Sequence, residues 1–505
     1  MNSSPGNLSP DSSAVTNPRA DAIGLEGDLA AGPPDDIRAR LAQVLQDQRT
    51  AFDAHPSPDY RNRKASLLAL KRLVSDNHPA LVEAINADYG NRSRHETMFS
   101  EIVVVLESID HALRHLKRWM KPRRRRVDWM IYPGARNLLI PQPLGVVGVI
   151  VPWNFPVQLA FAPLANIFAA GNSAMVKLSE NSPRLAELLT RLSPDYFPAE
   201  KLQFFAETGN VGVEFSQLPF DHLLFTGSGQ TGRKVMAACA ENLTPVTLEL
   251  GGKSPAVIAP DYPLKRAVER ILYGKLLNAG QACVGVDHCY VPADRLDAFV
   301  SASREYVARH YPDIASPDYT SIIDDRSFER LQASLEDAAA RGAELINLSA
   351  PASPLPRQRK FPPHLVLGAD DRMEVMQREI FGPVLPVFTY TDPRDVVDAI
   401  NRRDRPLAFY PFTHDRKLQR FYIEQTRSGG VCINDTLLHV AQHDLPFGGI
   451  GPSGMGHYHG REGFETFSKL RPVFHQARFS SLKLLAPPYG RLADRVLDLL
   501  IRLHR

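Results

Sequence analysis

The sequence has few of the residues that mark exported or disulfide-stabilised proteins. Cysteine occupies only four of 505 positions, with no CxxC pair, and these are Cys239, Cys283, Cys289 and Cys432. Four scattered thiols in so long a chain do not make a disulfide framework and are typical of a reducing compartment. No basic segment followed by an apolar run opens the sequence, so we expect no secretory signal and predict a cytoplasmic protein.

Charge of one sign and uninterrupted hydrophobic runs are also missing. The 59 basic residues nearly balance the 56 acidic ones, which argues against a polyanionic partner. The most apolar segment, 138–176, is broken by five prolines, so it indicates a buried strand, a loop and a helix, and no integral membrane span is expected. Residues 121–126 form a short basic run, which fits either a nucleic-acid or phospholipid patch or else a solvated connector or subunit rim. Because no companion motif accompanies it, we favour the connector or rim and expect no nucleic-acid partner.

What is present is an α/β pattern behind a polar tail. Residues 1–36 contain no aromatic residue and are rich in Ser, Pro, Gly, Ala and Asp, so we expect a disordered tail. Apolar residues at helical spacing follow over 37–52 and 99–116. Short apolar runs then alternate with helical stretches, and the runs are 145–151, 173–178, 202–206, 222–226, 246–250 and 256–258. This alternation predicts βαβ units, a largely parallel sheet and an α/β fold class.

Three polar residues in small-residue loops or turns are candidates for catalysis. Cys283 ends the segment NAGQAC, and Glu249 lies 34 residues earlier in LELGGK. A thiolate attacks carbonyl carbon to form a covalent adduct, and a nearby carboxylate activates the water that hydrolyses the resulting thioester. Asn154, in the rigid turn PWNFP, is a candidate oxyanion donor. The same amide is equally able to satisfy backbone groups of a proline turn.

A glycine-rich loop follows the run 222–226. The segment GSGQTG at 227–232 satisfies G-x-G-x-x-G ahead of a predicted helix, a context suited to binding a pyrophosphate, and its candidate ligands are Gly227, Ser228 and Gly232. A literal dinucleotide-fold interpretation makes Glu249 the ribose ligand, in competition with its role as a base. Lys177 and Glu180, after another predicted strand, offer an alternative pair for the ribose. They are equally compatible with exposed residues at a helix start.

Six motifs in a fixed order resemble those of the NAD(P)-dependent aldehyde dehydrogenase superfamily. They are PWNFP at 152–156, FTGS at 225–228 with Gly232, LELGGKSP at 248–255, GQAC at 280–283, EIFGP at 379–383 and PFGG at 446–449. The resemblance extends over roughly residues 37–478. It implies an aldehyde dehydrogenase fold with a Rossmann-like cofactor domain, an α/β catalytic domain and a β oligomerisation arm, assembled as a homodimer.

The resemblance also implies boundaries for these parts. The NAD(P)-binding domain is expected at 37–126 and 147–248, the catalytic domain at 249–452, and the arm at 127–146 and 453–478. Residues 479–505 remain as an amphipathic tail whose helical stripe over 491–505 suits a membrane surface, a cover over a subunit groove, or plain packing. We favour plain packing.

The same resemblance assigns roles to the candidate residues. Cys283 is implied to be the nucleophile, Asn154 and the backbone amide of Cys283 to form the oxyanion hole, and Glu249 to activate the hydrolytic water. The implied cofactor is NAD, with NADP as the alternative. Its implied ligands are Lys177 and Glu180 for the adenosine ribose and Glu379 for the nicotinamide ribose, with Phe381 beside the nicotinamide. Glu249 is thereby reassigned from ribose ligand to base.

Two further segments bear on the substrate. GMGHYHGREGFETFS at 454–468 resembles the class 3-like branch, which includes bacterial coniferyl aldehyde dehydrogenases and fatty aldehyde dehydrogenases, and HVAQHDLPFGG at 439–449 is most similar to the coniferyl group. The expected reaction is oxidation of coniferyl aldehyde to ferulate. The alternative is a broad-specificity or medium- to long-chain aliphatic aldehyde. Transfer of the acyl group to coenzyme A is disfavoured, because Glu249 supplies what hydrolysis requires.

Several histidines raise the possibility of a metal site. His439 and His443 have the i, i+4 spacing of helical metal ligands, and His457 and His459 follow. No Glu follows His439 directly, however, and the region continues into a glycine-rich segment. We therefore expect packing near the substrate entrance and no metal.

Overall fold

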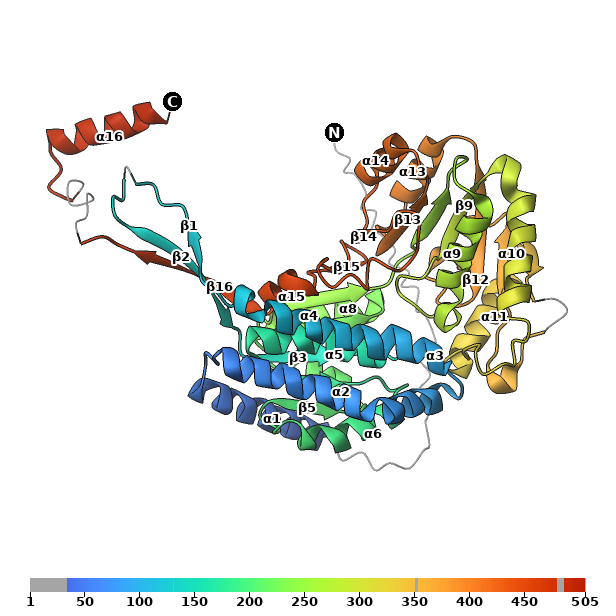
Figure 1. The fold of residues 1–505 in the computed structure, drawn as a ribbon, viewed down its shortest axis with the longest axis horizontal. Helices are drawn as coiled ribbons and strands as arrows, with labels where there is room; N and C mark the ends of the chain where they lie inside the picture. Colours follow the sequence, from blue (N-terminus) through green and yellow to red (C-terminus); the bar gives the residue numbers. More distant parts are fainter. Residues whose placement is uncertain (1–33, 130, 350–352, 479–485, 505) are drawn as a thin grey trace, which may run out of the picture.

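The computed structural model describes residues 34–129, 131–349, 353–478 and 486–504, which form two α/β bodies and a projecting arm (Figure 1). Most of the predicted tail lies outside the described residues. Its last residues belong to the first helix, α1 (Pro34–Ala54). Among the described residues, no helix has the length and apolar character needed to cross a membrane.

A layer of helices covers one side of the first body (Figure 1). After α1 come α2 (Tyr60–Tyr89), α3 (Arg94–Thr97), a π-helical turn η1 (Met98–Val103) and α4 (Val104–Trp119). The helices predicted over 37–52 and 99–116 are thus confirmed. The π-helical turn, which periodicity did not predict, places Glu101 in the buried interior.

The first body is built on a six-stranded sheet of order β15-β7-β6-β3-β4-β5. Its strands are β3 (Val146–Ile150), β4 (Ser173–Lys177), β5 (Leu202–Phe205), β6 (His222–Gly227), β7 (Val246–Leu250) and β15 (Gly454–Met455). All pair in parallel except β15, which runs antiparallel to β7. The predicted parallel sheet is confirmed. Its connections are α5 (Pro156–Ala170), α6 (Pro183–Leu192), η2 (Ser193–Asp195), α7 (Val211–Ser216) and α8 (Gly229–Glu241).

Helix α5 is the centre of this body. Every one of its residues is buried, which matches its almost uniformly apolar sequence, because a helix that is hydrophobic on all sides is stable only in the interior. It packs against α2 and α4, and along the chain it connects β3 to β4. Since α5 begins at Pro156, the buried helix fixes the turn that carries Asn154.

The second body has a seven-stranded sheet of order β10-β11-β12-β9-β8-β13-β14. Its strands are β8 (Pro255–Ile258), β9 (His288–Pro292), β10 (Glu344–Asn347), β11 (His364–Leu367), β12 (Val384–Tyr390), β13 (Ala408–Phe412) and β14 (Gly430–Val431). Only the β10–β11 pair is antiparallel. Its helices are α9 (Leu264–Leu276), η3 (Leu277–Gly280), η4 (Ala293–Arg295), α10 (Leu296–His310), α11 (Asp325–Ala340), η5 (Pro356–Gln358), α12 (Glu374–Gln377), α13 (Pro393–Asn401) and α14 (Arg416–Gln425).

A three-stranded antiparallel arm projects from the first body (Figure 1). It consists of β1 (Arg123–Arg125), β2 (Arg136–Pro143) and β16 (Ser468–His475), with β2 in the middle. The short helix α15 (Gly460–Thr466) leads into β16. The basic run, expected to be a solvated connector or a subunit rim, contains the strand β1, which belongs to the arm although it precedes the boundary placed at 126.

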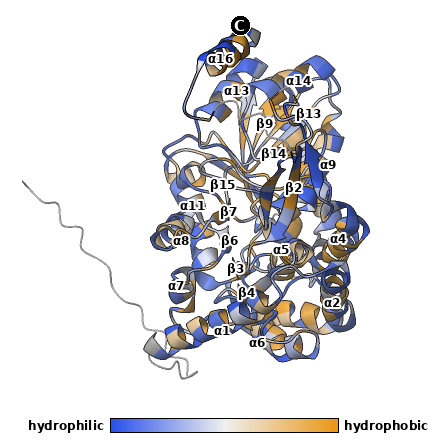
Figure 2. Cartoon of the chain, turned by 90° about the vertical axis from the view of Figure 1, so that its left-hand side faces the viewer, coloured by the Kyte–Doolittle hydropathy of each residue, from blue (hydrophilic) through white to orange (hydrophobic). Residues whose placement is uncertain are grey.

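The C-terminal helix α16 (Arg491–Leu503) confirms the predicted amphipathic helix but not its expected packing. Figure 2 shows hydrophobic and hydrophilic residues on different sides of this helix. Leu492, Leu499 and Ile501 are 58%, 58% and 55% exposed. Within the described part of the chain these side chains are thus more than half exposed, and the expectation of plain packing stays a prediction.

Candidate active site

Cys283 lies in a loop whose strained backbone is held by side chains from several elements. Asn278 and Ala279 have φ values of 53° and 51°, a left-handed conformation that costs free energy in residues other than glycine. The Asn278 side chain donates to the Tyr89 hydroxyl and to the Asn154 carbonyl, both at 3.1 Å. These contacts stabilise the strained loop and join it to α2 and to the Asn154 turn.

The Asn154 side chain is buried beside the Cys283 loop. Its Nδ2 donates to the Gln281 carbonyl at 3.3 Å, and Gln281 is itself held by its bond from Nε2 to the Ser321 carbonyl at 3.0 Å. A primary amide has two N–H donors, so one is available for a substrate oxygen. The geometry is compatible with the predicted oxyanion donor.

Glu249 is a buried carboxyl group with no local partner. It lies in β7 opposite Gly454 of β15, and no described residue donates a hydrogen bond to either of its carboxylate oxygens. Burial raises the pKa of Glu249 well above its ordinary value. A raised pKa makes the carboxylate a stronger base, as the general base in a proton transfer requires.

The environment of Cys283 disfavours the thiolate. Burial, followed by the nearby carboxyl groups of Glu379 and Glu249, raises the pKa of Cys283 to about 12, while the backbone amide of Val284 acts in the opposite direction. The thiol is therefore protonated at neutral pH in the free protein. Attack on a carbonyl requires that a base take this proton.

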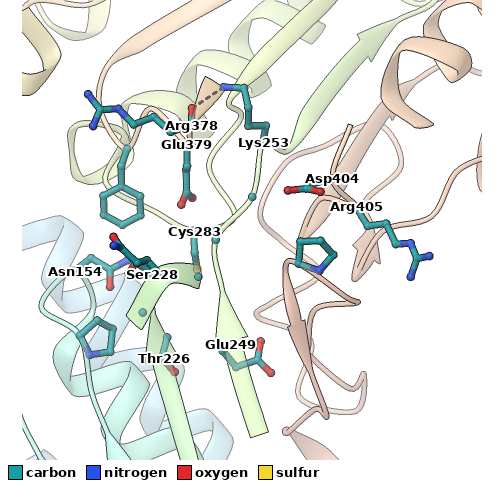
Figure 3. Close-up of a pocket in the computed structure, with 18 of the residues that line it drawn as sticks. Asn154, Thr226, Ser228, Glu249, Lys253, Cys283, Arg378, Glu379, Asp404 and Arg405 are labelled. Atoms are coloured by element: carbon teal, nitrogen blue, oxygen red, sulfur yellow. Dashed lines mark hydrogen bonds between the residues drawn. The ribbon is translucent and has the colours of Figure 1, made fainter. Parts of the chain in front are cut away.

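Two cavities meet at Cys283. The first, of about 670 Å³, brings together seven predicted residues (Figure 3), and these are Asn154, Gly227, Ser228, Glu249, Cys283, Glu379 and Phe381. The second, of about 260 Å³, is lined mainly by apolar side chains. Among the described residues, Cys283 is the only one that lines both. A molecule in either cavity can thus reach the same sulfur atom.

The glycine-rich loop presents a helix N-terminus to the larger cavity. Ser228 caps α8 by accepting a hydrogen bond from the Thr231 amide at 3.2 Å, and Gly229 and Gln230 of the first turn line the cavity. Free amides at a helix N-terminus favour an anion. Gly232 does not line the cavity. A Cβ there would lie 2.7 Å from a methyl carbon of Leu250, so this glycine permits close packing of α8 on β7.

Lys177 and Glu180 lie at the carboxyl end of β4 and do not line the cavity. Lys177 forms an ion pair of 2.6 Å with Glu207, whose carboxylate also accepts the Val211 amide at the start of α7. Glu180 is exposed and accepts a hydrogen bond from Ser179. The partner Glu207 was missed, although an acidic residue directly after the apolar run 202–206 was the available signal.

Glu379 and Phe381 enter the cavity from one loop. Burial, followed by the charge of Asp287, raises the pKa of Glu379 to about 8, while the Gly252 amide lowers it. Phe381 has a φ of 50°, and its ring meets the Trp153 ring edge to face at a centroid distance of 5.4 Å.

Three charged residues that were given no role in the sequence hold this loop. Lys253 pairs with Asp287 and donates to the Val375 carbonyl at 2.7 Å. Asp287 accepts the Ile380 amide at 2.9 Å, and Arg330 donates to the Ile380 carbonyl at 2.7 Å. The one signal in the sequence was a charged residue inside a largely apolar run, at Asp287, whereas Arg330 lies in a charged helical stretch that gave none.

The smaller cavity has aromatic walls, formed by Phe99, Phe155, Tyr273, Phe447 and Tyr458. The histidines of the 439–459 region lie close to it: the ring of His459 stacks on Phe447 at 5.7 Å. His443 pairs with Glu107 at 3.5 Å. Within the described ranges, no three His, Cys, Asp or Glu side chains are arranged to hold a metal ion.

Comparison with known proteins identifies this arrangement. Residues 25–473 match the model of the aldehyde dehydrogenase family, and the chain belongs to that family. It is an NAD(P)-dependent oxidoreductase that oxidises an aldehyde, and the resemblance drawn from the six motifs is confirmed.

The relatives narrow the comparison. A probable coniferyl aldehyde dehydrogenase from Pseudomonas aeruginosa is 48% identical over 90% of this chain and 95% of its own. The coniferyl aldehyde dehydrogenase of a Pseudomonas species is 43% identical over 84% of this chain and 88% of its own. Among solved structures, the substrate-bound state of Staphylococcus aureus AldH has a TM-score of 0.85 at 33% identity and covers 91% of this chain and 99% of that one.

Proposed function

We propose that this enzyme oxidises coniferyl aldehyde to ferulate through a thioester on Cys283. The observation that carries the proposal is the position of Cys283 in the wall shared by the two cavities. The larger cavity has the donors of a dinucleotide site, and the smaller one has the aromatic walls of a site for a flat, apolar substrate. An aldehyde in the smaller cavity and a cofactor in the larger one would therefore approach the Cys283 sulfur from opposite sides.

In the proposed mechanism Cys283 gives its proton to a base, and the sulfur attacks the aldehyde carbon to form a thiohemiacetal. The Asn154 amide stabilises the oxygen that gains negative charge. Removing one donor of this kind raises the activation free energy by about 3 kcal/mol. The residues of the larger cavity would hold NAD(P), which would supply the acceptor for the hydride that leaves the adduct carbon. Glu249 then takes a proton from water, whose oxygen attacks the thioester, so that the carboxylate leaves and the Cys283 thiol is restored.

The residues of the larger cavity fit a dinucleotide. The free amides at the start of α8 suit a pyrophosphate, and Arg378, Arg403 and Arg405 add positive charge to the lining. We propose Glu379, which lines this cavity, as the acceptor for the ribose hydroxyls on the nicotinamide side, with Phe381 beside the ring. We propose Lys177 and Glu180 for the adenosine ribose and NAD as the preferred cofactor, because the Glu180 carboxylate would repel the 2′-phosphate of NADP.

The identity of the aldehyde rests on the relatives' names and on the aromatic lining. Rings of Phe155, Tyr273 and Phe447 can stack with or meet the edge of a phenyl ring, an arrangement worth about 0.5–1.5 kcal/mol beyond burial. A medium- or long-chain alkanal is the second candidate, because the same lining is apolar.

The test compares kcat/KM for coniferyl aldehyde with kcat/KM for a series of alkanals, using both cofactors. We expect coniferyl aldehyde to be preferred. A preference for alkanals by about tenfold, which is about 1.4 kcal/mol of transition-state binding, would overturn the substrate assignment and leave the mechanism intact.

We further propose that the enzyme acts in the cytoplasm as a homodimer. The arm offers the outer edges of β1 and β16, and an exposed strand edge is suited to pairing with a second copy. The scarcity of cysteine supports a reducing compartment.

A further inference from the structure

A fully buried ion pair lies behind the Asn154 turn and has no part in the mechanism above. Arg92 follows α2, and Glu101 lies in the π-helical turn η1. Their side chains are both 0% exposed, with Arg92 Nη1 at 3.2 Å from Glu101 Oε1. Neither residue lines the two cavities that meet at Cys283.

Arg92 acts on the backbone of Asn154. Its Nη1 donates to the Asn154 carbonyl at 2.6 Å, and the same oxygen accepts Asn278 Nδ2 at 3.1 Å and the Tyr89 hydroxyl at 3.2 Å. The charged donor makes the shortest of the three bonds, as charge-assisted hydrogen bonds do. Three donors on one carbonyl fix the plane of the peptide from which the Asn154 side chain extends.

Glu101 acts on the other side of the same turn. Its Oε2 accepts the Val157 amide at 2.7 Å and the Gln158 amide at 3.2 Å. These amides belong to the first turn of α5, whose N-cap residue, Phe155, has no side-chain acceptor. A carboxylate from η1 thus caps α5 in place of a local residue.

The pair therefore holds the turn on both sides of Asn154. The guanidinium of Arg92 also lies 4.9 Å from the centre of the Phe155 ring. The carbonyl of residue 154, the ring of residue 155 and the amides of residues 157 and 158 are all held by one pair of charges. A shift of the pair would move the Asn154 amide directly.

The Arg92–Glu101 pair is not expected to add much to the free energy of unfolding. Burial raises the pKa of Glu101, while Arg92 and the two amides lower it in favour of the carboxylate. Arg92 Nε and Nη2 have no acceptor among the described residues. A buried ion pair with unused donors adds little net stability compared with apolar residues of the same size. Its geometry, and not its stability, is what the site uses.

We propose that Arg92 and Glu101 are positioning residues that hold the Asn154 amide where it meets the oxyanion. The inference rests on the proposed role of Asn154 in catalysis. Misplacement of a catalytic group by about 1 Å costs on the order of 100-fold in rate. We therefore expect Arg92→Lys to lower kcat by about 10- to 100-fold, because lysine keeps the charge but its shorter side chain ends one bond before the position of Nη1, the atom that contacts both Asn154 and Glu101.

A double-mutant cycle tests this positioning role. Steady-state kcat and KM are measured with coniferyl aldehyde, or with the best substrate of the panel, for the wild type, Arg92→Lys, Asn154→Ala and the double variant. Asn154→Ala should lower kcat by about 100- to 1,000-fold. The double variant should be no slower than Asn154→Ala, within about threefold, because Arg92 has nothing left to position. KM should change little in each.

The outcomes separate the two proposals. If the losses multiply in the double variant, Arg92 does not act through Asn154 and the inference is overturned. If Asn154→Ala alone keeps full kcat, the proposed oxyanion donor itself is wrong, and the inference is overturned with it.

The cycle is repeated with Glu101→Gln, which keeps an acceptor for α5, so that poor folding of Arg92→Lys still leaves a decisive result. The matched control is Lys71→Met, which removes the 2.6 Å Lys71–Asp110 pair between α2 and α4 and should leave kcat unchanged.

Discussion

At the scale of single residues, burial sets the chemistry of the site. It is the largest cause of the raised pKa values of Cys283, Glu249 and Glu379. The sequence was sufficient to select these residues, because their motifs are local. It did not predict their pKa values, nor the contacts of Lys253 with Val375 and of Arg92 with Asn154, because these partners lie 122 and 62 residues away in the chain.

The raised pKa of Cys283 predicts how its reactivity depends on pH. The thiolate is the reactive form, and with a pKa near 12 its fraction in the free enzyme rises with pH throughout the stable range. Alkylation of Cys283 by iodoacetamide, followed by peptide mass mapping, should accelerate by about tenfold per pH unit above pH 7. A rate that levels off below about pH 8 would show a thiol of ordinary or lowered pKa. Cys283→Ser supplies the background.

Gly251 gives a prediction for the cofactor side. A Cβ at this position would overlap the Glu379 carboxylate, so Gly251→Ala must displace Glu379 from the cavity wall. We expect KM for NAD to rise about tenfold, equivalent to about 1.4 kcal/mol, with KM for the aldehyde nearly constant. Gly490→Ala is the control, because among the described residues, its chain neighbours aside, no atom would lie within 4 Å of a Cβ there. An unchanged KM for NAD would exclude a role for Glu379 in binding it.

At the scale of elements, the spacing of apolar residues predicted most strands and helices of the first body, whereas the residues that cap its helices were not predicted. The five parallel strands of the first sheet and the helices α4 and α8 follow from apolar spacing and from the glycine motif, whereas β15 was not predicted. Nor was the strand β1, because three consecutive arginines carry no alternation, and its pairing with β2 is what makes it a strand. The cap of α5 was likewise hidden, since Glu101 lies 56 residues before Val157, whereas Glu207, which caps α7, lies only four residues before Val211 and was simply missed.

The buried helix α5 gives a prediction of stability. Phe161 is 0% exposed, and its ring stacks on the ring of Phe204 at a centroid distance of 5.9 Å. Phe161→Ala should lower the free energy of unfolding by about 3–5 kcal/mol, measured as a fall in the urea midpoint. Leu492→Ala in the exposed face of α16 should change it by less than about 0.5 kcal/mol. Equal effects of the two substitutions would contradict the assignment of α5 to the core.

At the scale of the whole molecule, the arm and α16 leave apolar surface exposed. The resemblance predicted an arm, whereas sequence patterns alone did not, since its strands come from segments more than 300 residues apart. Trp129 is 74% exposed and Phe474 of β16 is 48% exposed. Such residues on a projecting sheet are typical of a surface between subunits.

A charged substitution on the exposed surface of the arm tests the proposed homodimer. Light scattering should give twice the chain mass for the wild type, and Phe474→Glu should shift the population towards the monomer, because a buried unpaired carboxylate opposes association. Val213→Glu, at an equally exposed apolar residue of α7, is the control and should remain dimeric. A monomeric wild type would contradict the dimer.

The central claim is that Cys283 carries the substrate as a thioester that Glu249 releases. It is tested most directly by rapid quenching of Glu249→Gln mixed with coniferyl aldehyde and NAD, followed by intact and peptide mass measurement. The structure predicts one equivalent of NADH formed quickly, a feruloyl group on Cys283, and slow turnover afterwards. Full turnover with no adduct on Cys283 would contradict the claim.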